Sequence, residues 1–204
     1  MKRKFVSKAA ALLLCAALLT GCGSKGGETE LSENPPGDAV QESGAVLPED
    51  LPDELVFASG AGAWATVMTP ERDGTFSGEY HDSDMGDSGG EYPNGTVYVC
   101  DFSGRFSDIE KADENSYSMT LAEIGSDYEA EKEWIEDGVR YVSSEPYGIE
   151  DGDEFILYLP DTPTDGLDEE FLSWWPGRYM TEEQTGTLGM YGLYNVKMGY
   201  GFFG

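Results

Sequence analysis

The feature that most constrains this chain is a pair of short segments whose side chains alternate in character and which are separated by a tight-turn signal. In residues 75–81, Phe76 and Tyr80 fall on one face, and polar side chains fall on the other. Large and small residues alternate in residues 64–69, and an Asp-Gly pair at 73–74 lies between the two segments. Because successive side chains of a strand point to opposite faces, this pattern predicts a β-hairpin with one buried face.

Further strand signals follow along the chain. Alternating runs predict strands at residues 96–106, 117–124 and 139–142. The continuous apolar run 155–159 predicts a short strand that is buried on both faces. In residues 188–203, apolar side chains recur at most even-numbered positions, which predicts a long final strand with one buried face.

Helix signals are few. Residues 168–175 predict one short helix, because Asp168 can cap its N-terminus and Pro176 stops it. Residues 127–136 fit either a short helix or a loop. With seven or eight strands, short turns and one or two short helices, we expect a mainly β domain. An antiparallel up-and-down barrel or a sandwich, closed by the last strand, fits this pattern best.

The N-terminus carries a targeting signal. Four basic residues precede an apolar run at residues 9–19, which is shorter than the roughly 20 residues needed to span a bilayer. The run ends in Leu-Thr-Gly-Cys at residues 19–22 and resembles the lipobox of bacterial lipoproteins. That resemblance implies cleavage before Cys22, acyl chains such as palmitate on its lipidated end, and a location on the extracytoplasmic face of the cell membrane. The alternative is an ordinary cleaved signal followed by a chance cysteine.

The composition divides the chain into three parts. Residues 1–21 form the expected signal peptide. Residues 22–54 are rich in Gly, Glu, Ser, Pro and Asp, and predict a disordered acidic tether. Residues 55–204 carry the strand signals and predict one β-rich domain.

Charge excludes several classes of function. After loss of the signal peptide, eight basic residues face 40 acidic residues, so the net charge is −32. Nucleic-acid binding requires a cationic surface and is therefore excluded. Anionic lipid headgroups repel such a domain, so the anchor is the expected membrane contact.

Cysteine and histidine offer little chemistry. Cys15 leaves with the signal and Cys22 is expected to be lipidated, so Cys100 is left without an intramolecular partner. Cys100 is predicted to be a core residue, with a reactive thiol as the alternative. His81 is the single histidine, and its parity places it on the polar face, away from Cys100. We therefore predict no zinc site based on His and Cys, and no catalytic residues are assigned.

An acidic, glycine-containing loop is the candidate cation site. Asp82, Asp84, Asp87 and Glu91 can supply the hard oxygen ligands that Ca²⁺ requires. The spacing does not follow the EF-hand order, because glycine occupies position 86. The alternative is a solvated hairpin loop, since acidic residues with glycine recur in other loops of the chain.

Two resemblances extend this interpretation. The segment Gly62-Ala63-Trp64 is similar to the Gly-x-Trp motif of lipocalins, in which the Trp plugs the closed end of a barrel. Residues 57–203 also resemble an uncharacterised lipoprotein family of anaerobic Gram-positive bacteria. The shared pieces are residues 59–64, 82–86, 92–96 and 137–141. This second resemblance implies a fold and a location, but no activity.

Two functions remain open from the sequence. The first is a binding module for a small apolar or carbohydrate ligand, or for another envelope protein. One of the adjacent Trp174 and Trp175 is expected to pack, while the other either covers the barrel or stays exposed to stack on a sugar or partner. The alternative is a carboxylate-dependent hydrolase, although nothing in the sequence selects two of the many acidic residues. An internal cavity of about 300 Å³ or more would favour the first function.

Overall fold

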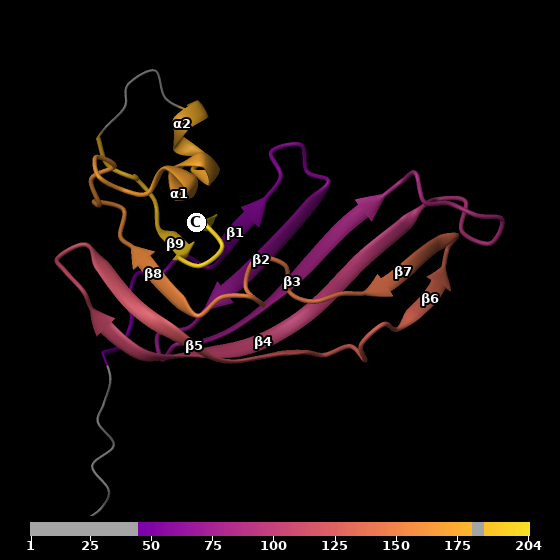
Figure 1. The fold of residues 1–204 in the computed structure, drawn as a ribbon, viewed down its shortest axis with the longest axis horizontal. Helices are drawn as coiled ribbons and strands as arrows, with labels where there is room; N and C mark the ends of the chain where they lie inside the picture. The colour runs from indigo at the N-terminus through magenta and orange to yellow at the C-terminus, as the bar shows by residue number, and fades with distance from the viewer. Residues whose placement is uncertain (1–44, 181–185) are drawn as a thin grey trace, which may run out of the picture. The chain divides into compact units, whose positions relative to one another are not determined.

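The computed structural model describes residues 45–180 and 186–204 (Figure 1). Within these residues, eight antiparallel strands form a closed barrel, as the sequence predicts. The barrel strands are β1 (Leu55–Ala58), β2 (Trp64–Pro70), β3 (Thr75–Asp84), β4 (Thr96–Lys111), β5 (Ser116–Ser126), β8 (Glu154–Tyr158), β9 (Gly192–Asn195) and β10 (Tyr200–Phe203). No helix among the described residues has the length and apolar character needed to cross a membrane.

The barrel is of the up-and-down type. Each strand pairs with the next barrel strand in the chain, and β1 pairs with β10 through Val56 and Phe203 to close the ring. The predicted hairpin is β2–β3, with Met68 opposite Gly78. Gly74 has a φ of 86°, and a Cβ there would lie 2.7 Å from Ile109 Cδ1, so both the turn and the packing require glycine.

A hairpin is inserted between β5 and β8. It consists of β6 (Glu133–Glu136) and β7 (Val139–Ser143). This corrects the prediction of a short helix or a loop for residues 127–136, because residues 133–136 form a strand and only residues 127–132 are loop. Asp137 and Gly138 both have positive φ, the geometry of a two-residue hairpin turn. β7 lies parallel to the first residues of β4, at the right of Figure 1, beyond the part of β4 that pairs with β5.

The barrel interior is filled by side chains. Its buried core includes Leu55, Phe57, Met68, Phe76, Cys100, Phe102, Phe106, Met119, Phe155, Leu157, Leu193 and Phe202. The apolar cavity that remains beside Leu157 and Leu193 measures about 10 Å³. A cavity of this size holds at most one water molecule. The sequence-based criterion of a ligand-sized internal cavity is therefore not met at this place.

One end of the barrel is closed by residues 45–52, which we call the strap. Leu47 is 3% exposed and joins the barrel core, and its backbone N–H donates to Arg72 O at 2.9 Å. The Tyr191 hydroxyl donates to Asp50 Oδ1 at 2.8 Å. The packed domain thus begins before the predicted boundary at residue 55, because apolar residues of the supposed tether cover an open barrel end.

Residues 144–152, which we call the plug, close the opposite end. The Thr66 hydroxyl donates to Tyr147 O at 2.7 Å, and Asn195 Nδ2 donates to Gly148 O at 2.9 Å. Ile149 is fully buried in the barrel core. The backbone carbonyls of Tyr147 and Gly148 are therefore satisfied inside the barrel, as buried polar groups require.

Two short helices lie outside the barrel. α1 (Glu169–Trp174) is capped by Asp168, whose Oδ1 accepts from Glu170 N at 2.8 Å, and α2 (Gly177–Met180) follows. Phe171 of α1 packs beside Gly192 and Gly201, where an added Cβ would lie within 3 Å of its ring.

This packing corrects the prediction for residues 188–203. They form the β9–β10 hairpin instead of one long strand, and all four residues of β9 are buried. The helix covers the outer face of this hairpin, while the barrel core covers the inner face. A strand with both faces covered does not show the simple alternation that the sequence analysis assumed.

Candidate binding groove

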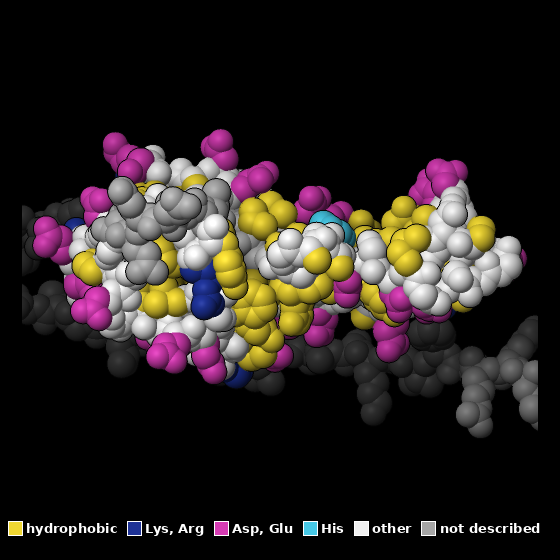
Figure 2. Space-filling view, turned by 90° about the horizontal axis from the view of Figure 1, so that it is seen from above, with side chains coloured by type: hydrophobic (Ala, Val, Ile, Leu, Met, Phe, Trp, Pro, Cys, Tyr) yellow, Lys and Arg dark blue, Asp and Glu magenta, His cyan; other side chains and the backbone are white. Residues whose placement is uncertain are grey.

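One open feature of the described surface is a groove outside the barrel, between β1, β10 and the two helices. Its volume is about 610 Å³, within the range typical of small-molecule sites. Hydrophobic side chains gather between the helical part and the β1–β2 loop in the centre of Figure 2. The groove is lined by Val56, Ala58, Ser59, Gly60, Ser173, Trp174, Pro176, Tyr179, Gly201 and Phe203.

Trp174 forms a fixed wall of the groove. Its ring centroid lies 4.8 Å from that of Phe57 and 5.9 Å from that of Tyr200, both in edge-to-face geometry. Its indole N–H donates to Gly199 O at 3.1 Å. These contacts hold the ring in place before any ligand arrives, which lowers the entropic cost of binding.

Trp175 packs at a different place from Trp174. It is 8% exposed, and its indole N–H donates to Leu188 O at 3.1 Å. Trp174 is partly buried. Both adjacent tryptophans therefore pack against the barrel, and Trp174 also keeps a surface that lines the groove.

The rim of the groove is aromatic and exposed. Tyr179 is 81% exposed, and the Arg178 guanidinium lies 5.3 Å from its ring centroid. An exposed aromatic ring of this kind presents an apolar face and a polar hydroxyl to an incoming molecule.

Two hydroxyl groups supply polar contacts in the groove. Ser59 Oγ accepts from Ala63 N at 3.1 Å, so its hydroxyl hydrogen can still be donated. The Ser173 hydroxyl donates to Glu170 O at 2.6 Å, so its oxygen can still accept. None of the lining residues carries a charge. The groove therefore suits a neutral ligand that has both hydroxyl groups and a flat apolar face.

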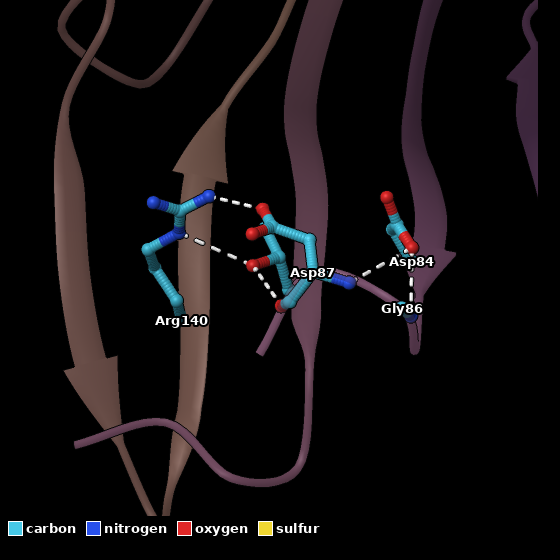
Figure 3. A network of polar contacts seen from close by, with 5 residues as sticks. Asp84, Gly86, Asp87 and Arg140 are labelled. Atoms are coloured by element: carbon cyan, nitrogen blue, oxygen red, sulfur yellow. Dashed lines mark hydrogen bonds and ion pairs between the residues drawn. The ribbon is translucent and has the colours of Figure 1, made fainter. Parts of the chain in front are cut away.

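The acidic loop is organised by its own hydrogen bonds (Figure 3). Asp84 Oδ1 accepts from the backbone N–H groups of Gly86 at 2.8 Å and of Asp87 at 3.2 Å. Asp87 forms an ion pair with Arg140 of β7, and Arg140 Nε donates to the Thr96 hydroxyl at 3.1 Å. Asp84 is thus engaged within the loop itself, and Asp87 holds the loop to the inserted hairpin.

The structure does not bring the predicted cation ligands together. Within the described ranges, no three His, Cys, Asp or Glu residues are arranged so that they could hold a metal ion. Asp82 and Asp84 lie at the end of β3, whereas Glu91 lies further along the loop that follows it. Calcium binding at Asp82, Asp84, Asp87 and Glu91 gains no geometric support from this arrangement.

Cys100 and His81 lie on opposite faces of the sheet. Cys100 is fully buried in the barrel core, and burial raises the pKa of its thiol. His81 is exposed on β3, opposite Val99 of β4. A neutral, enclosed thiol is a poor nucleophile, so the core interpretation of Cys100 is confirmed.

Trp64 lies at the plugged end of the barrel. It begins β2 instead of the first strand, and its ring lies 4.8 Å from Phe57 and 5.3 Å from Tyr147 of the plug. The Trp64 ring therefore packs against the plug at one end of the barrel. The three-residue motif itself ends at the first residue of the second strand.

One carboxylate of the plug has altered acidity. Glu150 is half-buried, and this burial raises its pKa above the ordinary value. Its Oε2 accepts from Ile149 N at 3.0 Å. Burial also raises the pKa of neighbouring Tyr80 to about 12, and the charges of Asp82 and Glu150 add to that effect.

Sequence reasoning found only part of this groove. The Trp174-Trp175 pair signalled an aromatic surface, but Val56, Ala58 and Gly201 carry no distinctive pattern. They meet only because β1 pairs with β10 to close the barrel.

Cys22, the predicted lipidation site, lies outside the described residues. Comparisons with protein-family models, curated proteins and solved structures found no significant match to the chain.

Proposed function

We propose that this chain is a lipid-anchored, extracytoplasmic binding module that holds an uncharged, hydroxyl-bearing ligand in the groove outside its barrel. The observation that carries the proposal is the contrast between two spaces. The groove offers about 610 Å³ with no charged lining residue, whereas the apolar cavity inside the barrel offers about 10 Å³. A ligand of ordinary size therefore fits outside the barrel and not within it.

The chemistry of the lining favours a short neutral oligosaccharide. Sugar rings present flat C–H faces that pack on aromatic side chains such as Trp174 and Tyr179. Their hydroxyl groups can pair with the remaining donor of Ser59 and the remaining acceptor of Ser173. A strongly anionic ligand is disfavoured, because the chain's net charge is −28.

The test is calorimetric titration of the protein with cellotriose and with triacetylchitotriose. Gly60 lines the groove, and a Cβ added there meets open space, so Gly60→Phe fills the groove without disturbing the barrel. Gly90 also faces open space but lies on the acidic loop, so Gly90→Phe is the matched control. We expect binding of at least one sugar, a loss of about tenfold or more in Gly60→Phe, and no change in Gly90→Phe. Equal binding by both variants would contradict the proposal.

The anchor is tested separately. Cys22→Ser removes the thiol on which the lipid is expected, so the protein should move from the membrane pellet to the soluble fraction or the medium. The control is Cys15→Ser, which changes a cysteine within the expected signal peptide and should leave the protein in the pellet. Unchanged membrane association of Cys22→Ser would refute the anchor.

A carboxylate-dependent hydrolase is the second candidate, and Glu150 is the observation in its favour. A half-buried carboxylate with a raised pKa is suited to donate a proton. The charges of Asp82 and Glu150 both raise the pKa values of Tyr80 and Tyr147. We would expect the protein to cleave 4-nitrophenyl glycosides and Glu150→Gln to abolish that activity. Absence of turnover in the unmodified protein would remove this candidate.

A further inference from the structure

The outer face of the inserted hairpin carries a cluster of three aromatic rings, separate from the groove. Trp134 of β6 lies opposite Tyr141 of β7, and their rings stack at 5.2 Å with an interplanar angle of 13°. Tyr128 lies 5.7 Å from Trp134, and its hydroxyl donates to Asp101 Oδ2 at 2.9 Å. All three rings are only half-buried. We call Tyr128, Trp134 and Tyr141 the ring cluster.

The rim of the ring cluster is strongly acidic. Residues 127–137 hold six acidic residues and one lysine, whereas acidic residues make up 40 of 204 in the whole chain. These six are Asp127, Glu129, Glu131, Glu133, Glu136 and Asp137. All six are exposed, and in the described part of the chain none of them forms an ion pair.

The ring cluster already accommodates a cation. The Lys132 ammonium lies 5.5 Å from the centroid of the Trp134 ring, within the range of cation–π attraction. Half-buried aromatic residues surrounded by exposed charges are the usual arrangement of a protein interface, where the rings provide affinity and the rim provides steering.

We propose that the ring cluster and its acidic rim form a docking surface for a basic segment of another protein, rich in arginine or lysine. Charge complementarity selects this occupant. A second copy of the chain would bring six more carboxylates to the same place, and nucleic acid or anionic lipid would be repelled. This surface lies on a different element from the groove, so the inference does not depend on the proposed sugar binding.

The probe for this surface is a fluorescent, tryptophan-free 12-residue peptide of alternating Arg and Ser, titrated with the full chain and followed by anisotropy. The first variant changes Glu129, Glu131, Glu133 and Glu136 to Gln and leaves the rings intact. The second is Trp134→Ala. The matched control removes the same number of exposed charges elsewhere, through Asp161→Asn, Asp165→Asn, Glu169→Gln and Glu114→Gln.

We expect the four-glutamine variant of the acidic rim and Trp134→Ala each to weaken peptide binding about tenfold or more. The charge control should change peptide binding less than about twofold. A peptide with citrulline in place of Arg should not bind. Equal losses in the hairpin and control charge variants would mean that net charge alone attracts the peptide, and would overturn the proposal. Tight binding of the citrulline peptide, or a Trp134-dependent dimer seen by light scattering, would also overturn it.

Discussion

The two faces of β1 and β10 illustrate how this barrel differs from one that holds a ligand inside. Leu55 and Phe57 of β1 point into a core that is filled with side chains, whereas Val56 and Ala58 line the open groove. β10 alternates in the same way, with Phe202 inside and Phe203 outside.

This difference teaches that barrel closure and ligand binding can be separated. The strap and the plug fill both ends of the barrel, so the interior provides stability. The helices build a second, partly open apolar layer on the outside, which leaves room for a ligand. Substitutions on the inner face should therefore affect folding, and those at exposed positions of the groove should affect binding.

Phe155→Ala is expected to have the largest effect on stability. Phe155 is fully buried on the inner face of β8, and its ring lies 5.0 Å from Phe106. Its truncation should lower the free energy of unfolding by about 3–5 kcal/mol through lost burial and a new cavity. On the outside, Tyr179→Ala should change stability by no more than about 0.5 kcal/mol, because the side chain is exposed. Denaturant titrations of both variants test the contrast, and equal losses would break it.

Thr66→Val is expected to have an intermediate effect on stability. The substitution keeps the shape of the side chain but removes the hydroxyl that donates to Tyr147 O. The plug carbonyl would then lose its buried partner, at a cost of about 1–3 kcal/mol. Amide hydrogen exchange should show faster exchange at residues 147–149 than in the unmodified protein. If exchange and stability were both unchanged, the plug would not be held by this contact.

Glu150→Gln is expected to have the smallest effect on stability, and the size of this effect depends on pH. Because burial raises the pKa of Glu150 in the folded state, protonation favours folding. That contribution is complete below the ordinary pKa of 4.5 and is lost as pH rises through the raised folded-state value. At neutral pH the neutral glutamine should therefore give a slightly higher melting temperature, and the gain should vanish by about pH 4. A gain that persisted at low pH would point to a cause other than ionisation.

Local sequence signals predicted the elements better than their assembly. The β2–β3 hairpin and the Asp168 cap follow from alternation and capping chemistry, and both are present. The apolar run predicted a strand at 155–159 that is buried on both faces; the strand is present at Glu154–Tyr158, and its outer face is only half-buried. The β9–β10 hairpin was predicted as one strand, because the outer apolar residues that pack under α1 obscured its turn.

The groove and the strap could not be predicted, because both depend on contacts between distant parts of the chain. Leu47 lies in an acidic, Pro-containing stretch that gives no local sign of folding, yet it packs into a barrel end made by residues far along the sequence. The groove likewise needs Val56 beside Phe203, which only barrel closure provides. A single sequence does not contain such pairings in a readable form.

The most direct test of the account is methyl NMR of the protein labelled at Val and Leu, titrated with the tighter-binding of the two trisaccharides. Val56 lines the groove, whereas Leu157 and Leu193 line the small interior cavity. We predict that the Val56 methyl resonances shift in proportion to ligand occupancy, while those of Leu157 and Leu193 stay in place. Shifts confined to Leu157 and Leu193, with Val56 unchanged, would place the ligand inside the barrel and contradict the account.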